Sequence, residues 1–295
     1  MNILFASGKG GAGKTTVTAG LAAFWPRSNV LADADVEAPD LGLYLPHAFT
    51  ASEPVGLEVP VRIRTDRCDL CGECTAICQF NAIKLLAGRI MPFSDMCHGC
   101  GGCSAVCAPN AIVTGTRELG QLHTGTTSDG RPFFEGRSRI GEAMTPPIIR
   151  ALLRRARETA AKLGADLLID APPGVSCPVM TASAAADAGV LVADPTPFGV
   201  HDFKLALKAF EEAGKPVAVI INRSGQADIA ASEADLAEFC ETRGISVLAR
   251  LPFDREAAAH AAGGQHPLTL SDVWRTRFAE AAARTAEHFH GGAHV

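Results

Sequence analysis

The chain has 295 residues, of which 47% are hydrophobic, 20% charged and 6% aromatic, and its formal net charge is −5. This composition is typical of a globular protein with one large domain or two, and the lack of a polybasic stretch argues against a nucleic-acid partner. No apolar run approaches the length of a transmembrane helix, so we expect no membrane span. The N-terminus runs directly into an apolar segment, which leaves no room for a signal peptide. We therefore expect a cytoplasmic protein whose ten cysteines bind metal rather than form disulfides.

Residues 8–16 read GKGGAGKTT and fit the phosphate-binding pattern G-x-x-x-x-G-K-[ST]. They lie between an apolar predicted strand, residues 3–6, and an alanine-rich predicted helix, residues 17–25. In this setting backbone N–H groups and the helix N-terminus face the phosphates, Lys14 reaches the β- and γ-phosphates, and the Thr15 hydroxyl holds Mg²⁺. The predicted ATP-binding residues here are Gly8, Lys9, Gly10, Gly11, Ala12, Gly13, Lys14, Thr15 and Thr16.

Lys9, directly after the first glycine, makes the loop resemble the deviant Walker A motif of the signature-lysine ATPases. That superfamily contains the MinD and Mrp proteins, the ParA partition ATPases and the nitrogenase iron protein, and in it the extra lysine crosses a dimer interface to the partner's nucleotide. The resemblance therefore implies a homodimer, or a dimer with a paralogue, that encloses ATP, with Lys9 and Lys14 as catalytic residues. Taken alone, Lys9 also fits a solvated loop lysine.

Two aspartates, Asp33 and Asp35, follow a second predicted strand at residues 29–32. Acidic residues at a strand end beside a P-loop lie where open α/β sheets bind ligands. The segment resembles the Walker A′ segment of the same family, which implies that Asp35 positions the attacking water and that Asp33 lies near the Mg²⁺. Without the P-loop, an acidic turn interrupted by Pro39 would be the preferred interpretation.

The apolar segment at residues 166–170 ends in Asp170, the Walker B form, and Asp170 should hold Mg²⁺ through water. Residues 171–174 resemble the switch segment of Mrp and MinD proteins, in which a glycine N–H can meet the γ-phosphate. Cys177 matches a cluster-ligating cysteine of the nitrogenase iron protein, but a second such cysteine is missing because none occurs between Ala108 and Ser176. We interpret Cys177 as a small buried thiol in preference to a metal ligand.

Eight of the cysteines form two copies of the pattern C-x₂-C-x₂-C-x₃-C, 29 residues apart, and both copies continue into Asn-Ala-Ile. This is the spacing of the bacterial two-cluster ferredoxin, in which the fourth cysteine of each copy ligates the other cluster. The proline that usually follows the fourth cysteine is absent, and two Cys₄ zinc sites are the alternative. The predicted ligands are Cys68, Cys71, Cys74 and Cys107 for one [4Fe–4S] cluster, and Cys97, Cys100, Cys103 and Cys78 for the other.

The predicted fold class is α/β: a P-loop domain of residues 1–60 and 115–295, with a mainly parallel sheet between helices. Residues 61–114 form a predicted inserted α+β ferredoxin domain. Residues 42–58 look like a loop, and Gly130 is predicted to turn a hairpin. Further helices are expected at residues 147–163, 202–213 and 232–243, and further strands at residues 189–193, 217–221 and 246–249.

The family resemblance also implies where adenine binds, at the ends of the last two strands. The residues concerned are Asn222, Arg223 and Pro252, with Phe253 and Asp254 beside them. Cys240 is expected in the core, His123 and His201 in structural or solvated positions, and the tail from His288 to His294 as a frayed end.

The functional hypothesis is an ATP-dependent electron carrier in which hydrolysis and dimer rearrangement control when the clusters pass electrons to a redox partner. The alternative is a maturation factor of the Mrp kind that carries an iron–sulfur or metal cofactor to an apo-protein. A positioning ATPase like MinD is disfavoured because the sequence has no basic amphipathic C-terminal helix.

Overall fold

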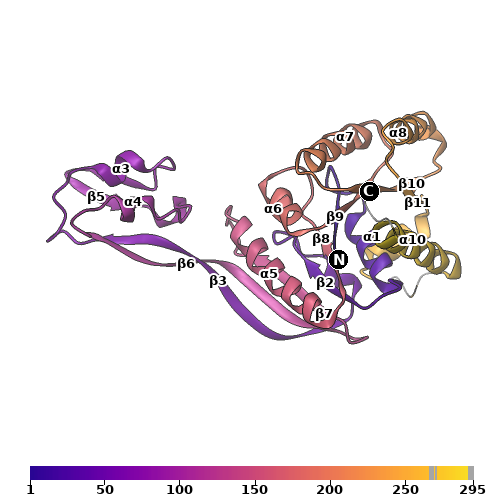
Figure 1. The fold of residues 1–295 in the computed structure, drawn as a ribbon, viewed down its shortest axis with the longest axis horizontal. Helices are drawn as coiled ribbons and strands as arrows, with labels where there is room; N and C mark the ends of the chain where they lie inside the picture. The colour runs from indigo at the N-terminus through magenta and orange to yellow at the C-terminus, as the bar shows by residue number, and fades with distance from the viewer. Residues whose placement is uncertain (266–268, 270, 292–295) are drawn as a thin grey trace.

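The computed structural model describes residues 1–265, 269 and 271–291, and Figure 1 shows an α/β body from which a long ribbon carries a smaller, cysteine-rich unit. In the described residues nine strands form one sheet in the order β11-β10-β9-β1-β8-β2-β7-β6-β3. From β11 to β7 neighbouring strands run parallel, whereas β7, β6 and β3 pair antiparallel. The parallel strands are β1 (Asn2–Ala6), β2 (Asn29–Asp33), β7 (Pro132–Ser138), β8 (Asp166–Asp170), β9 (Ala188–Ala193), β10 (Val217–Ser224) and β11 (Val247–Pro252).

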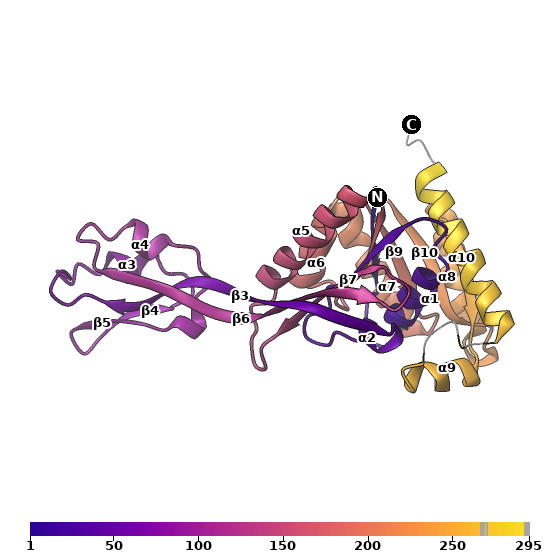
Figure 2. The same cartoon turned by 90° about the horizontal axis from the view of Figure 1, so that it is seen from below.

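Helices cover both faces of the parallel strands, which explains why every residue of β2, β8 and β9 is buried. One face packs against α5 (Pro146–Leu163), α6 (Cys177–Ala185), α7 (Pro197–Glu212) and α8 (Ala230–Thr242). The other packs against α1 (Lys14–Ala23), α2 (Leu41–Tyr44) and α10 (Asp272–Gly291), with α9 (Arg255–Ala262) at its border (Figure 2). The predicted α/β sheet between helices is confirmed. Helix α7 begins five residues earlier than predicted because Thr196 caps it, accepting a hydrogen bond from Gly199 N at 3.2 Å.

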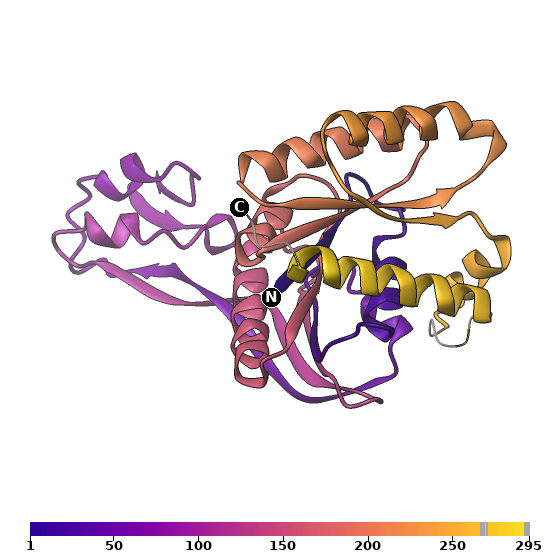
Figure 3. The same ribbon diagram turned by 45° about the vertical axis from the view of Figure 1, so that its right-hand side comes forward.

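The expectation of a frayed tail is wrong for the described part, because His288 and His290 belong to α10, which lies across the strands in Figure 3. The helix buries Trp274, Phe278 and Phe289. It approaches α1 so closely that a Cβ on Gly20 would lie 2.3 Å from the Phe278 ring. The expectation for His294 falls outside the described residues.

A two-stranded ribbon of β3 (His47–Ile63) and β6 (Ile112–Thr127) leads from the sheet to the cysteine-rich unit (Figure 2). The prediction of a loop at residues 42–58 is therefore wrong. Pro54, which with Pro46 and Gly56 suggested a loop, lies in β3, the edge strand, where a missing N–H costs no pairing on the open side. The predicted limits of the insert, residues 61 and 114, fall within these two strands, so continuous strands join the unit to the body.

The cysteine-rich unit is small and has little core of its own. It consists of α3 (Glu73–Ile77), β4 (Ile83–Leu86), β5 (Arg89–Pro92), the 3₁₀ turn η1 (Ser94–Met96) and α4 (Gly102–Ala105). Two clusters of three buried residues each lie in it, one of which joins Val59 of β3 to Ala82 and Cys97. Elsewhere, the hairpin predicted at Gly130 joins β6 to β7, and the short turn η2 (Ala227–Ile229) precedes α8. Among the described residues, no helix combines the length and apolarity that crossing a membrane requires.

Candidate functional site

The P-loop connects β1 to α1 and needs glycine at two points of close approach. A Cβ on Gly8 would lie 2.2 Å from the backbone oxygen of Asp202 in α7. A Cβ on Gly13, which has φ of 86°, would lie 2.2 Å from Nδ2 of Asn222. The loop is therefore held between α7 and the end of β10, which orients its backbone N–H groups before any ligand binds.

Lys14, Thr15 and Asp170 meet at the start of α1. Lys14 Nζ lies 2.7 Å from Asp170 Oδ2, and Thr15 Oγ1 donates to the same oxygen at 2.8 Å. The second carboxylate oxygen accepts from Thr18 Oγ1 at 2.8 Å. Lys14 is only 6% exposed, so its ammonium group depends on this partner. The cation and the hydroxyl predicted to receive phosphate and Mg²⁺ thus lie together beside the aspartate predicted to hold that ion.

Asp33 and Asp35 lie on the same edge of the sheet but in different surroundings. Asp33 is fully buried and accepts hydrogen bonds from Asp35 N at 3.1 Å and Leu41 N at 2.8 Å. Its carboxylate therefore stabilises the loop of residues 34–40 between β2 and α2, here called the acidic loop. Burial, followed by the nearby Asp170 carboxylate, raises the pKa of Asp33 well above its usual range. Asp35 is half-buried, and desolvation raises its pKa to about 6 although Lys14 opposes the shift. A carboxyl group tuned in this way suits a residue that exchanges or orients a proton near neutral pH.

Lys9 is not a freely solvated lysine. Its Nζ lies 3.0 Å from Asp194 Oδ2 and 3.2 Å from Thr196 Oγ1, at the end of β9. To reach a second subunit, as predicted, the side chain has to leave this buried carboxylate.

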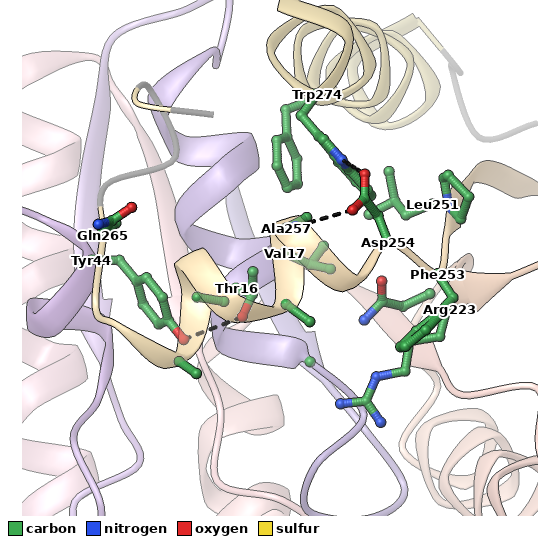
Figure 4. Close-up of a pocket in the computed structure, with 17 residues that line it drawn as sticks. Thr16, Val17, Tyr44, Arg223, Leu251, Phe253, Asp254, Ala257, Gln265 and Trp274 are labelled. Carbon is green, nitrogen blue, oxygen red and sulfur yellow. Dashed lines mark hydrogen bonds between the residues drawn. The ribbon is translucent and has the colours of Figure 1, made fainter. Parts of the chain in front are cut away.

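A cavity of about 310 Å³ opens beside Gly13 and Thr16 (Figure 4). Asn222, Arg223, Pro252, Phe253 and Asp254 line it, so all five residues predicted near adenine lie around one space. Asn222 also donates to Ala12 O at 2.8 Å and so ties this wall to the P-loop.

Three aromatic residues that line the same cavity were not predicted: Tyr44, Trp274 and Phe278. The Trp274 indole N–H donates to Asp254 Oδ2 at 2.8 Å, which closes the wall between β11 and α10. Residues 271–291 do show helical apolar spacing, but that spacing alone gives no sign that the helix packs against this cavity.

The structure corrects one cysteine and supports another. Cys177 is exposed at the first position of α6, so its interpretation as a buried thiol is wrong. It lies three residues after the predicted switch segment, beside a cavity that α5 also lines. Cys240 is fully buried, as expected.

The other eight cysteines surround two cavities, each lined by cysteines of both sequence repeats. The cavity farther from the body, here called the distal cavity, measures about 20 Å³ and is lined by Cys68, Cys71, Cys74 and Cys107. The cavity nearer the body, the proximal cavity, measures about 310 Å³ and is lined by Cys78, Cys97, Cys100 and Cys103. These are the two predicted ligand sets. The distal cavity has room for little more than a water molecule, so its cysteines have to move outward to hold a larger group.

Backbone N–H groups point at the sulfurs in both sets. Ala82 N lies 3.3 Å from Cys78 Sγ and Ala111 N lies 3.3 Å from Cys107 Sγ, which repeats one contact in the two halves of the unit. Gly99 N lies 3.4 Å from Cys97 Sγ. Desolvation, followed by the neighbouring Cys107, raises the pKa of the Cys74 thiol, as expected for a thiol that depends on metal to become a ligand.

Within residues 1–265, 269 and 271–291, no three His, Cys, Asp or Glu side chains converge closely enough to hold a single metal ion. The eight cysteines are thus spread around their cavities, and their present positions favour neither the predicted iron–sulfur clusters nor the alternative zinc sites. His123 and His201 also lie apart from the cysteines: His123 Nδ1 is 2.7 Å from Ser52 Oγ, and His201 is exposed on α7.

Comparison with known proteins identifies the family of the nucleotide-binding fold. Residues 3–268 match the family model of the CobQ/CobB/MinD/ParA nucleotide binding domain. The chain is 34% identical over 234 residues to the uncharacterized protein MJ0578 of Methanocaldococcus jannaschii, covering 78% of this chain and 80% of that protein. It is 28% identical to the uncharacterized protein MJ0579 of the same organism, covering 78% and 82%.

Solved structures share the fold at low sequence identity. The cell division ATPase MinD of Pyrococcus furiosus superposes with a TM-score of 0.57 at 18% identity, covering 97% of this chain and 98% of that one. MinD of Pyrococcus horikoshii, complexed with Mg-ADP, gives 0.55 at 18% identity, covering 100% and 99%.

Proposed function

The chain belongs to the CobQ/CobB/MinD/ParA family of nucleotide-binding proteins, and from this premise we propose that it is an ATPase whose nucleotide cycle controls electron transfer through two [4Fe–4S] clusters to a partner protein. The observation that carries the proposal is the arrangement of eight cysteines around two cavities in the ferredoxin-like sets. A two-stranded ribbon joins these cavities to the sheet that bears the P-loop.

ATP fits the first site through groups that already face it. The P-loop N–H groups and Lys14 supply positive charge for the phosphates, and the cavity bounded by Asn222, Arg223 and Pro252 takes the base. Thr15 and Asp170, with Asp33 behind them, would hold Mg²⁺, which neutralises charge on the phosphates.

Hydrolysis requires an oriented water molecule and a closed site. We assign the water to Asp35, whose pKa of about 6 lets it accept a hydrogen bond in its ionised form at neutral pH. We assign closure to Lys9 of a second subunit, in a homodimer or a dimer with a paralogue. In this step the Lys9 ammonium group would leave Asp194 and bind a phosphate of the partner's nucleotide, so it would stay paired with an anion throughout.

Thiols and backbone donors of the second site would hold the clusters, once the cysteines of the distal set have moved outward. The cysteine sulfurs supply the ligands, and the N–H groups of Ala82, Gly99 and Ala111 stabilise negative charge on them. When bound, the clusters supply one-electron chemistry, and the two adjoining cavities of one unit suit a short relay.

Cofactor delivery is a second candidate function, and one observation favours it. Cys71 in the distal set and Cys100 in the proximal set are both exposed, so a thiol of an apo-protein can approach either one. Clusters that survive many ATP turnovers support electron transfer, whereas stoichiometric loss to an acceptor protein supports delivery.

The test begins with metal content. Anaerobically purified protein should contain about eight iron and eight sulfide per chain, and Cys78→Ser should remove about half of both. Because Cys78 belongs to the first repeat but to the proximal set, the loss should affect the cluster whose other ligands are Cys97, Cys100 and Cys103. Stoichiometric zinc without visible charge-transfer absorption contradicts the proposal.

Control by nucleotide is tested by linkage. If ATP changes the reduction of the clusters, reduction must change ATP affinity by the same factor. We expect an ATP analogue to bind the oxidised and reduced proteins with different affinities, and Lys9→Ala to diminish that difference. Equal affinities in the wild-type protein rule out nucleotide-gated transfer.

A further inference from the structure

The two cysteine cavities differ in how they meet the body. Residues 63–112 alone supply the lining of the distal cavity, whereas Glu58, Pro60 and Thr114 of the ribbon also line the proximal one. Leu57 of β3 packs against both the large core of the body and the group of Val59, Ala82 and Cys97. A Cβ on Gly99 would lie 2.6 Å from the Leu57 side chain, so the backbone beside Cys97 rests directly on this residue.

Arg117 makes a second connection at the same place. It is 8% exposed on β6, and its Nη1 donates to the backbone oxygens of Ser94, at 3.0 Å, and Asp95. Ser94 O also accepts from Cys97 N at 3.1 Å, so the arginine holds the turn that places Cys97. Nη2 lies 3.4 Å from Oε1 of Glu142, whose side chain is 5% exposed and which precedes α5 in the body.

Glu142 is joined in turn to the acidic loop of the nucleotide site. Its backbone N–H donates to Arg139 O at 3.0 Å, and Arg139 follows Ser138, whose N–H donates to Val36 O at 2.8 Å. Val36 is the residue after Asp35. A short series of hydrogen bonds and buried contacts therefore runs from the predicted water-positioning residue to the turn before Cys97.

From these contacts we infer that nucleotide state reaches only the proximal set of cysteines, and that Arg117, held by Glu142, is the positioning residue that transmits it. This inference rests on the proposed function. A buried ion pair responds as a unit, because shifting one partner alone leaves the other charge desolvated and unpaired. Movement of the acidic loop on loss of the γ-phosphate would therefore shift Arg117 and the turn at residues 94–97 together.

The test is hydrogen–deuterium exchange on anaerobically purified, cluster-loaded protein, with and without a non-hydrolysable ATP analogue. In the wild type we expect exchange at residues 94–99 to change by about fivefold or more, and exchange at residues 68–74 to stay constant. Arg117→Met should abolish the response at residues 94–99 and leave the analogue affinity within about threefold, because Arg117 does not touch the nucleotide cavity. In the wild type, the analogue should shift the reduction potential of one cluster. In Arg117→Met, it should shift the potential of neither cluster.

Two further variants keep the test decisive. Glu142→Gln removes the charge but retains an acceptor for Met144 N, which in the wild type lies 2.8 Å from Oε1. This variant should reproduce the loss of coupling and serves if Arg117→Met fails to fold. Arg155→Met is the matched control, because Arg155 also joins the body to the ribbon, through Glu53 at 2.6 Å, but the pair is exposed and should leave the response intact. A response that persists in Arg117→Met and Glu142→Gln, or that appears equally at both sets, overturns the inference alone. No response anywhere in the wild type overturns nucleotide control itself.

Discussion

The nucleotide site and the cysteine-rich unit are built on opposite principles. Around the P-loop, β1 and β8 are almost completely buried, and Lys14, Thr15 and Asp170 are already joined by hydrogen bonds. The cysteine-rich unit has only two buried clusters, of three residues each, and leaves Ile77, Phe80 and Leu86 exposed. One site is preorganised by the fold, whereas the other depends on what its cysteines bind.

Size accounts for the difference. A segment of about 50 residues buries little apolar surface of its own, so that in the proposed function metal ligation supplies part of its folding free energy. The body has a core on each face of its sheet and needs no such contribution. The proposed function follows the same division: a preorganised site for the nucleotide, and a site for the proposed clusters that depends on their binding.

The largest difference between the two regions is expected when the proposed clusters are removed. Oxidation and chelation should unfold residues 64–111 while the body stays folded, because only the unit loses ligation energy. Limited proteolysis should then cut within these residues at least about tenfold faster, with ATP-analogue affinity changed by less than about threefold. A stripped protein that resists cleavage there would show that the unit folds without metal.

The second test acts on the preorganised site. Lys14→Ala removes the buried charge that faces the phosphates, and ATP affinity should fall on the order of 100-fold. Asp35→Ala should leave affinity nearly unchanged and slow hydrolysis, because this carboxylate acts on water. Binding is measured by calorimetry and turnover by phosphate release; iron content should be normal in both variants. An equal loss of affinity in the two variants would contradict the assignment of Asp35.

The smallest expected effect concerns pH. Burial raises the pKa of Asp35 from 3.8 to about 6, so its contribution to stability is complete below pH 3.8 and is lost as pH rises through about 6. Asp35→Asn removes this dependence, and the free energy of unfolding without nucleotide should exceed that of the wild type by about 1 kcal/mol at pH 8, after allowance for solvent screening of a half-buried group. Denaturant titrations at pH 4 and pH 8 measure the difference, which should nearly vanish at pH 4.

Local motifs indicated the nucleotide-binding fold because they are contiguous in the chain, whereas the roles assigned to single residues of the site stay predictions. The strand, the glycine loop and the helix are adjacent in sequence, and Asp170 ends an apolar strand of unmistakable pattern. The repeat predicted which cysteines lie around a common cavity, and their role as cluster ligands stays a prediction. The parallel α/β sheet followed from the alternation of strands and helices.

The predictions that were wrong concern features that depend on contacts between distant segments of the chain. The ribbon strand β3 carries two prolines and was predicted as a loop, because its position at the sheet edge is invisible along the chain. The position of α10, which is set by its packing on α1, and the exposure of Cys177 also depend on distant segments. Arg117 offered no signal at all, since its partners lie at residues 94, 95 and 142.

The aromatic wall of the nucleotide cavity sets an order of events during synthesis. A chain leaving the ribosome presents its P-loop among the first residues, but Trp274 and Phe278, which complete the cavity, emerge near the end. Until α10 has docked against Gly20, the base has no enclosed place, and the nascent protein holds phosphates through an open loop only. In the proposed function, stable ATP binding therefore comes late in folding, and a chain truncated before residue 274 would contain the entire cysteine repeat without a complete cavity for the base.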